Sequence, residues 1–447
     1  MNKKESFLRT VCNLAIPVTL QSMLQASFSI VDQIMIGQLG SVSVAGVGLA
    51  GKFLSIFSVL VSAVGVVAGI MISQYIGQDN AGEVRRSFYI NLGLAVILAG
   101  VFSVVCILYP RQIMSLYTKD QETLMVSAEY LLIVSSTFLL MAGSALLSTL
   151  FRCMEKAKLP LYANMASLLL NTGLNYILIF GKCGLSPMEA RGAALATLFS
   201  QMVNFVVMVI LVLKHGDLLK KSHLQEPALP GFHWRQYVHM LLPILVCEFM
   251  WSLGENIYAA IYGNIGTEAC AAMTLTNPIQ GLTIGALCGL SQAASVIVGK
   301  KLGTKDYADA YDAAKKLIWY GVAGSLILSV IIIFTSPFYV NIYQVEDSVK
   351  LLTRQILLAY AVVAPFKVLN MIVGGGIIRS GGKTDYVMYI DMIGTWCFGV
   401  PLGLLGAFVL KLPIPLVYFM LSLEECIRLG ISMVVLRRKK WMQSLEP

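Results

Sequence analysis

The chain has 447 residues, of which 57% are hydrophobic and only 13% are charged, and its mean hydropathy is +0.75. This composition is far too apolar for a soluble protein and indicates a polytopic membrane protein. The net charge of +9 would suit nucleic-acid binding in a soluble chain, but here the basic residues mostly flank apolar segments, so we expect no nucleic-acid partner. The nine cysteines are scattered singly and show no metal-site spacing.

A helix needs about 20 apolar residues to cross a bilayer, and the chain supplies twelve such stretches. They lie near 10–36, 44–73, 87–109, 124–150, 159–181, 189–213, 237–262, 268–298, 314–335, 350–377, 385–410 and 414–436. The basic start runs into the first stretch without a signal-peptide cleavage site, so we expect an uncleaved first span. The predicted fold class is an all-α membrane protein with twelve transmembrane helices.

The positions of Lys and Arg give the orientation. Most of the 33 basic residues fall in the N-terminal segment, the C-terminal segment and the loops that share their side. This is the bias of cytoplasmic loops, so we predict a multi-pass protein of the cell membrane with both termini in the cytoplasm.

The two halves of the sequence repeat each other. One fixed offset aligns several residues, which indicates an internal duplication. The aligned pairs are Pro17 and Pro243, Gly37 and Gly263, Gly40 and Gly266, Ala45 and Ala271, Gly77 and Gly303, and Glu83 and Asp309. Six spans per half is an even number, so we predict two parallel-repeat six-helix bundles around a central cleft. The predicted domains are an N-lobe at 1–213, a cytoplasmic linker at 214–235 and a C-lobe at 236–447.

Ionisable side chains inside a membrane segment cost on the order of 3 kcal/mol and are mostly functional. Asp32 ends the polar face of the first span. Asn171 and Asn175 lie one turn apart on the fifth span, and Thr197 lies on the sixth. These amides and this hydroxyl either join helices by hydrogen bonds or, close to Asp32, provide oxygen ligands for a hard cation.

The seventh span carries two acids on one face. Glu248, Ser252, Glu255 and Tyr258 follow at helical spacing, and packing alone does not explain two carboxylates in a membrane helix. We expect at least one of them to contact substrate or cation, and the sequence leaves open which of the two faces the cleft.

Three other acids are better explained as structural. Asp391 lies near the cytoplasmic end of the eleventh span, where we expect it to be solvated or to pair with Arg379 or Lys383. Glu424 and Glu425 lie in the last span, and at least one of them is expected to pair with Arg428.

Prolines occur inside several predicted helices. Pro17 and Pro243 occupy matched positions, and Pro365 and Pro401 interrupt two more spans. A proline removes a backbone hydrogen bond and lets a helix bend, so these positions are candidate hinges or static kinks.

Several motifs together resemble the multidrug and toxic compound extrusion (MATE) family over the whole length of the chain. They are the Asp32 acid before Gly37-Gln-Leu-Gly40, Gln74-Tyr-Ile-Gly77, Gly192-Ala-Ala-Leu-Ala-Thr197, Glu248-x-x-Trp251-x-x-Gly254, Arg379-Ser-Gly-Gly-Lys-Thr384, and Asp391-x-x-x-x-Trp396-x-x-x-x-Pro401. The resemblance implies export of organic cations and drugs, driven by inward flow of Na⁺ or H⁺, through rocking of two lobes.

The resemblance also implies a cation site formed by Asp32, Asn171, Asn175 and Thr197. Asn175 stands where many family members have a second acid, so the site has one negative charge fewer. An amide keeps an oxygen ligand but removes a proton acceptor, which favours Na⁺ and leaves H⁺ open. Other members place acids on the seventh and tenth helices, whereas the tenth span here carries Lys367 and Asn370.

The function we expect is therefore a cation-coupled antiporter for organic cations or drug-like molecules. The alternative is a flippase for a lipid-linked sugar, for which Lys52 and Lys367 are the supporting features. An intramembrane enzyme is a third hypothesis. The absence of a His/Asp or Ser/Lys cluster from the sequence argues against it. The sequence also has no phosphate-binding loop, so we expect no attached ATPase. We further expect no enzymatic activity and no cofactor. The protein is expected to be a monomer in the lipid bilayer.

Overall fold

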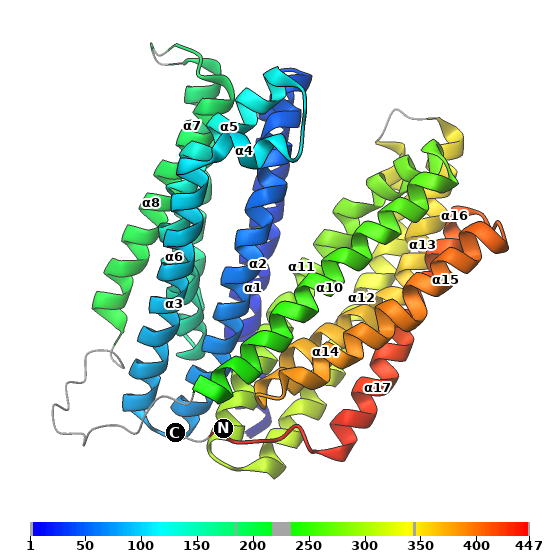
Figure 1. The fold of residues 1–447 in the computed structure, drawn as a ribbon. Helices are drawn as coiled ribbons and strands as arrows, with labels where there is room; N and C mark the ends of the chain where they lie inside the picture. The colour runs from blue at the N-terminus through cyan, green and yellow to red at the C-terminus, as the bar shows by residue number, and fades with distance from the viewer. Residues whose placement is uncertain (1–2, 183, 185, 217–233, 343–345, 446–447) are drawn as a thin grey trace. The chain divides into compact units, whose positions relative to one another are not determined.

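The computed structural model describes residues 3–182, 184, 186–216, 234–342 and 346–445, and the regular elements in these ranges are all helices. The all-helical fold predicted from the sequence is confirmed (Figure 1). The first half contains α1 (Lys3–Gly37), α2 (Ser41–Gly77), α3 (Ala81–Leu108), α4 (Pro110–Ser115), α5 (Gln121–Ser135), α6 (Phe138–Cys153), α7 (Lys158–Phe180) and α8 (Glu189–His215).

The second half contains three π-helical segments besides its α-helices. Its elements are α10 (Trp234–Ile265), α11 (Thr267–Gly303), α12 (Tyr307–Asn341), α13 (Asp347–Asn370), η1 (Met371–Ile378), α14 (Thr384–Met392), η2 (Ile393–Gly399), α15 (Val400–Leu404), η3 (Leu405–Val409), α16 (Ile414–Ser422) and α17 (Glu424–Arg438). Such π-segments are rare and frequently mark functional sites. In η1, the Ser291 hydroxyl donates to the Met371 carbonyl at 2.7 Å, which satisfies a backbone acceptor by a side chain.

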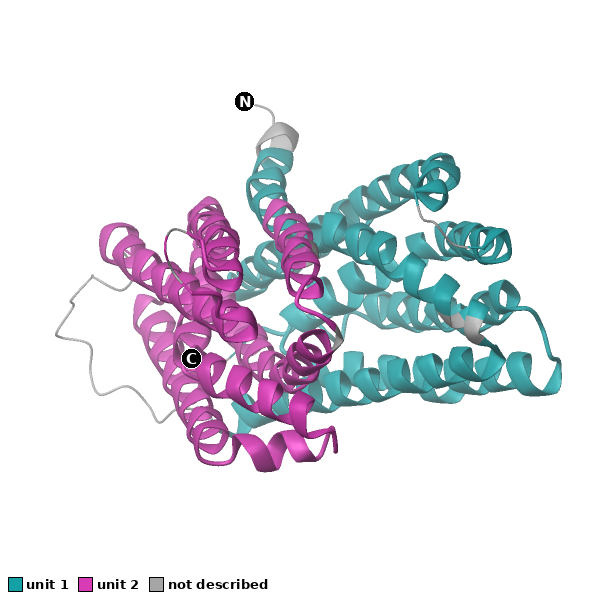
Figure 2. Cartoon of the chain, turned by 90° about the horizontal axis from the view of Figure 1, so that it is seen from above, with its two compact units in different colours: residues 1–19, 231–447 teal, residues 20–230 magenta. Residues whose placement is uncertain are grey.

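The helices group into two compact units, coloured separately in Figure 2. One unit comprises residues 20–230, and the other comprises residues 1–19 together with 231–447. The sequence placed the first 19 residues in the N-lobe, whereas the structure groups them with the second half. The reason is local packing, because the Thr19 hydroxyl donates to the Ala286 carbonyl of α11 at 3.0 Å. The predicted lobe boundaries themselves stay a prediction.

Ten helices among the described residues are long and apolar enough to cross a membrane. The predicted span 124–150 differs in shape, because α5 and α6 form one bent pair with a 50° break. The predicted span 414–436 is divided into α16 and α17, which have 9 and 15 residues. Charged side chains at Glu424, Glu425 and Arg428 lower the hydropathy of this last segment, which explains why it is less clearly a span than the others.

The duplication is visible in the geometry of matched turns. Gly40 precedes α2 with φ +96° and Gly266 precedes α11 with φ +153°, both in a region that favours glycine. Asn80 caps α3 by accepting from the Glu83 amide at 3.0 Å. At the corresponding place Asp306 caps α12 by accepting from the Asp309 amide, also at 3.0 Å. The repeated sequence thus builds the same helix starts twice. Glycines elsewhere let helices approach closely: a Cβ at Gly192 in α8 would lie 2.7 Å from the carbonyl carbon of Leu178 in α7.

Candidate functional site

The first predicted site lies within residues 20–230, where α1 meets α7. The Asn175 amide nitrogen donates to Asp32 Oδ1 at 2.8 Å and to Asn171 Oδ1 at 3.2 Å. Because both partners are acceptors, the orientation of the Asn175 amide is fixed. The Asn171 amide nitrogen in turn donates to the Ser200 hydroxyl of α8 at 3.3 Å. The structure therefore joins three of the four predicted residues in one hydrogen-bonded chain.

Two oxygen atoms of this cluster have unused capacity. Asn175 is only 2% exposed, and its Oδ1 has no hydrogen-bond partner among the described residues. Asp32 is half-buried, and its Oδ2 receives no hydrogen bond from any residue that the structure describes. A buried acceptor without a donor costs free energy, typically about 1–3 kcal/mol. Carboxylate and amide oxygens are the ligands that a hard cation such as Na⁺ prefers.

Thr197, the fourth predicted residue, is less directly connected. Its hydroxyl donates to the Ala193 carbonyl of its own helix at 3.0 Å. Tyr130 of α5 interacts with Thr197 and lies within electrostatic reach of Asp32. Tyr130 thus links Thr197 to the acid.

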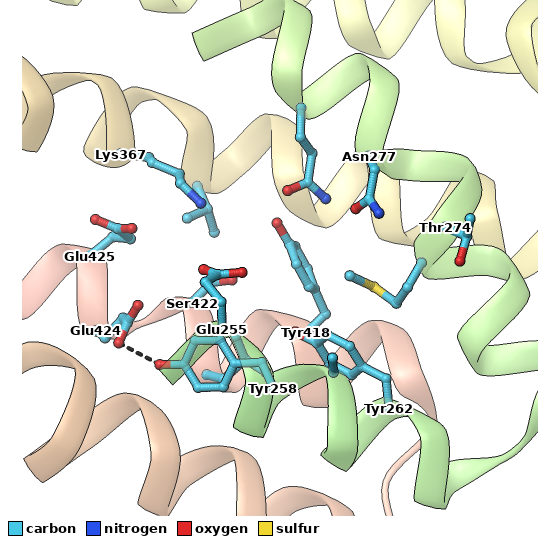
Figure 3. Close-up of a pocket in the computed structure, with 15 residues that line it drawn as sticks. Glu255, Tyr258, Tyr262, Thr274, Asn277, Lys367, Tyr418, Ser422, Glu424 and Glu425 are labelled. Atoms are coloured by element: carbon cyan, nitrogen blue, oxygen red, sulfur yellow. Dashed lines mark hydrogen bonds between the residues drawn. The ribbon is translucent and has the colours of Figure 1, made fainter. Parts of the chain in front are cut away.

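The second predicted site lies in the other unit, at a cavity of about 210 Å³ (Figure 3). Glu255 and Tyr258 of α10 line this cavity, as predicted for substrate-contacting residues, together with Lys367 of α13. Glu424 and Glu425 at the start of α17 also line it. Four further helices therefore contribute to a site that the sequence assigned to the seventh span alone: α11 and α16, which supply part of the polar lining, α13 and α17.

Arg428 organises the acids around this cavity. It is 7% exposed, and its guanidinium lies 3.6 Å from Glu424, 3.8 Å from Glu425 and 3.8 Å from Asp391. The Tyr258 hydroxyl donates to Glu424 at 2.6 Å, as the dashed line in Figure 3 marks. The expected pairing of Arg428 with the α17 acids is confirmed. The expected pairing of Asp391 with Arg379 or Lys383 is wrong, because Asp391 faces Arg428 in the packing of α14 against α17.

Glu248 and Glu255 line different cavities. Glu248 lies 3.8 Å from Arg379 and lines a second cavity of about 400 Å³, which also contains Asp391 and Arg428. The two acids are seven positions apart, which corresponds to about two helical turns, or about 10 Å along the axis. The two carboxylates on one helical face therefore line different cavities, which share Lys367 and Glu425 in their linings, and Glu255 is the one beside Tyr258.

A family model whose description is MatE matches residues 17–177 and again residues 243–405. The chain belongs to the MatE family. Both matched ranges begin at a proline, Pro17 and Pro243, so the MatE repeat coincides with the duplication found in the sequence. Both prolines lie inside continuous helices, α1 and α10.

Curated relatives of this MatE protein share its full length. An uncharacterized transporter of Bacillus subtilis, YisQ, is 21% identical over 438 residues, covering 96% of this chain and 94% of the relative. The probable multidrug resistance protein NorM of Thermotoga maritima is 25% identical over 421 residues, covering 90% of this chain and 88% of the relative. Among solved structures, a mutant of the Vibrio cholerae MATE transporter VcmN has a TM-score of 0.88 at 16% identity. The match covers 98% of this chain and 99% of the VcmN chain.

Sequence reasoning missed several residues of both MatE sites. Tyr130 and Ser200 carry no signal of their own, because a tyrosine and a serine in apolar spans are ordinary. Lys367 stands out in the sequence as a charge inside a span. Its place beside Glu255 depends on how α13 packs with α17 and α10 around the cavity. Glu424 and Glu425 were read as structural, and their ion pairs with Arg428 support that reading.

Proposed function

We propose that this MatE protein is a cation-coupled antiporter that exports organic cations and drug-like molecules across the cytoplasmic membrane by alternating access of its two lobes. The observation that carries the proposal is the hydrogen-bonded cluster of Asp32, Asn171 and Asn175 inside membrane helices. The relatives named as multidrug resistance proteins support the substrate class. Catalysis and a bound cofactor have no place in this proposal, which takes the protein to be a monomer with both termini in the cytoplasm.

We further propose Na⁺ as the coupling ion. Asp32 provides one negative charge, and the Asn175 oxygen provides a ligand that no donor within the described residues occupies. A proton would need only the carboxylate, whereas Na⁺ makes use of both oxygens. A cation held by both oxygens joins α1 to α7 in addition to the hydrogen bond from Asn175, and so changes the contact between the two helices.

Transport requires that cation binding change which lobe arrangement is favoured. Helix α1 is suited to carry this change, because it belongs to both compact units: its first turns pack through Thr19 on α11, and Asp32 contacts α7. Pro17 lies between the chain start and Asp32 and leaves a backbone carbonyl without its helical donor. In this proposal Pro17 is a hinge of the first helix, and Pro243 is its counterpart in α10.

The flippase alternative needs a basic cavity for a pyrophosphate-linked lipid. Lys367 is the one basic residue among those that line the smaller cavity, and three acids line it as well. Lys52 is exposed on α2. The balance of charge therefore favours a cationic or amphoteric substrate over a pyrophosphate.

The test is ion-dependent fluorescence of the purified protein at fixed pH. The proposal predicts a response to Na⁺ but not to K⁺, and loss of that response in both Asp32→Asn and Asn175→Leu. Asn264→Leu is the matched control, since Asn264 is an exposed amide whose one hydrogen bond to the described residues goes to the backbone of its own helix at 2.8 Å. A response to pH alone, with Asn175→Leu behaving as wild type, would overturn the Na⁺ assignment.

A further inference from the structure

The charged side chains that line the smaller cavity differ in whether they make ion pairs and hydrogen bonds within the protein. Glu424 accepts from Tyr258 and pairs with Arg428, and Glu425 accepts from Asn370 at 2.8 Å and pairs with Arg428. Both glutamates are buried. Arg428 therefore pairs with both acids, but its single positive charge offsets only part of their negative charge.

Lys367 and Glu255 are the two charges of this lining that make no ion pair among the described residues, although Lys367 lies within electrostatic range of Glu425 and Glu255. Among the described residues, no ion pair or hydrogen bond engages the Lys367 amine or the Glu255 carboxylate. Glu255 is exposed, and Lys367 is only partly so. Both side chains point into the cavity in Figure 3, the amine from α13 and the carboxylate from α10. A positive and a negative group that both remain unpaired in a membrane protein indicate a ligand with the opposite charges.

The rest of the lining suits the same kind of ligand. Neutral polar groups come from Asn277, Gln280 and Ser422, and Tyr262 and Tyr418 present aromatic rings. Amides and hydroxyls provide hydrogen bonds for polar ligand atoms, and the rings provide flat contact surfaces. At about 210 Å³ the cavity is smaller than the roughly 300–1,000 Å³ of drug-sized sites, so it holds a small molecule or one end of a larger one.

We propose that this cavity is a subsite for amphoteric substrates, in which Lys367 binds a carboxylate of the ligand and Glu255 binds its amine. The inference rests on the proposed export function and names a substrate class for it. A ligand that carries both charges pairs both groups that the protein leaves open, and these two ion pairs offset the cost of removing the ligand's own charges from water. Lys367 then determines specificity between amphoteric and purely cationic substrates.

The test measures binding to purified wild-type protein without an ion gradient. The two probes are 4-(aminomethyl)benzoate and its methyl ester, which keeps the amine but lacks the negative charge. Wild type should bind the carboxylate about tenfold more tightly than the ester. Lys367→Met should lower affinity for the carboxylate about tenfold and raise affinity for the ester, because a repelling charge is removed. Lys367→Arg should restore the preference.

Glu255→Gln should act in the opposite sense and weaken the ester more than the carboxylate, since Lys367 still attracts the latter. Lys52→Met, which removes an exposed lysine on α2, is the matched control and should leave the preference unchanged. The proposal is wrong if wild type shows no preference, or if Lys367→Met changes the affinities for both probes in the same proportion. Gradient-driven efflux of tetraphenylphosphonium by wild type tests the proposed export function separately, because that cation has no carboxylate.

Discussion

Asp32 shows how a single carboxylate is held in this protein. Among the described residues its hydrogen bond from Asn175 is the one side-chain bond it makes, and its second oxygen is free. Asn175 itself is held by Asn171, which contacts Ser200 on the next helix. The acid is therefore positioned by a relay of amides while one oxygen is left for a ligand.

Asp32→Asn keeps the size of the side chain and removes its charge. We expect gradient-driven efflux in cells to fall on the order of tenfold or more, because a neutral amide no longer attracts a cation. Glu122→Gln, which neutralises an exposed acid in the first turn of α5, should export at the wild-type rate. Equal efflux by Asp32→Asn and wild type at equal amounts of protein in the membrane would exclude Asp32 from coupling.

Arg428 is the central charge of the unit that comprises residues 1–19 and 231–447. Replacing it by Met leaves Glu424, Glu425 and Asp391 as neighbouring buried or half-buried acids, so we expect a loss of about 3–5 kcal/mol in stability. Thermal unfolding in detergent measures this loss, with the exposed Lys315→Met as control. The double variant Arg428→Met with Glu424→Gln should lose less than the single variant. A single variant as stable as wild type would show that these ion pairs contribute nothing.

At the scale of elements, close helix contacts determine where the polar side chains meet. The backbone of α8 approaches α7 at Gly192, and this contact brings Ser200 within reach of Asn171 and Ser167. In the other unit, a Cβ at Gly254 of α10 would lie 2.6 Å from a Thr395 side-chain atom in η2. The same principle therefore operates in both halves: small residues let the backbones approach, and polar groups then pair across the interface.

Gly192→Ala should separate α7 and α8, because its Cβ would lie 2.7 Å from backbone atoms that cannot move cheaply. We expect a loss of about 1–3 kcal/mol in stability, together with a weaker response to Na⁺. Gly173→Ala is the control on α7 itself, since a Cβ there meets no atom within 4 Å. If both variants unfold at the same temperature and both respond to Na⁺ as wild type does, the contact at Gly192 does not position the site.

At the scale of the whole molecule, the sequence predicts what depends on composition and repetition. Apolar length gives the helices, and the duplication gives matched turns at Gly40 and Gly266 and matched caps at Asn80 and Asp306. That Asp32 and Asn175 belong to one site follows from the sequence only through the family pattern that both positions match, and the hydrogen bond between them is seen only in the structure.

The rest depends on tertiary packing. Periodicity places Glu248 and Glu255 on one face, but it does not show that two turns separate them into different cavities. Nor does it show that Asp391 meets Arg428, because the two residues lie on different helices, α14 and α17. Lys367 is visible in the sequence as an unusual charge, yet its role depends on which acids are already paired with Arg428.

The most direct test of the account is efflux from proteoliposomes in which Na⁺ and H⁺ gradients are imposed separately. An inward Na⁺ gradient at equal pH on both sides should drive export of an organic cation by wild type, and Asp32→Asn should not export under the same gradient. Export that continues after both gradients are dissipated, or that only the pH gradient drives, would contradict Na⁺-coupled antiport through Asp32.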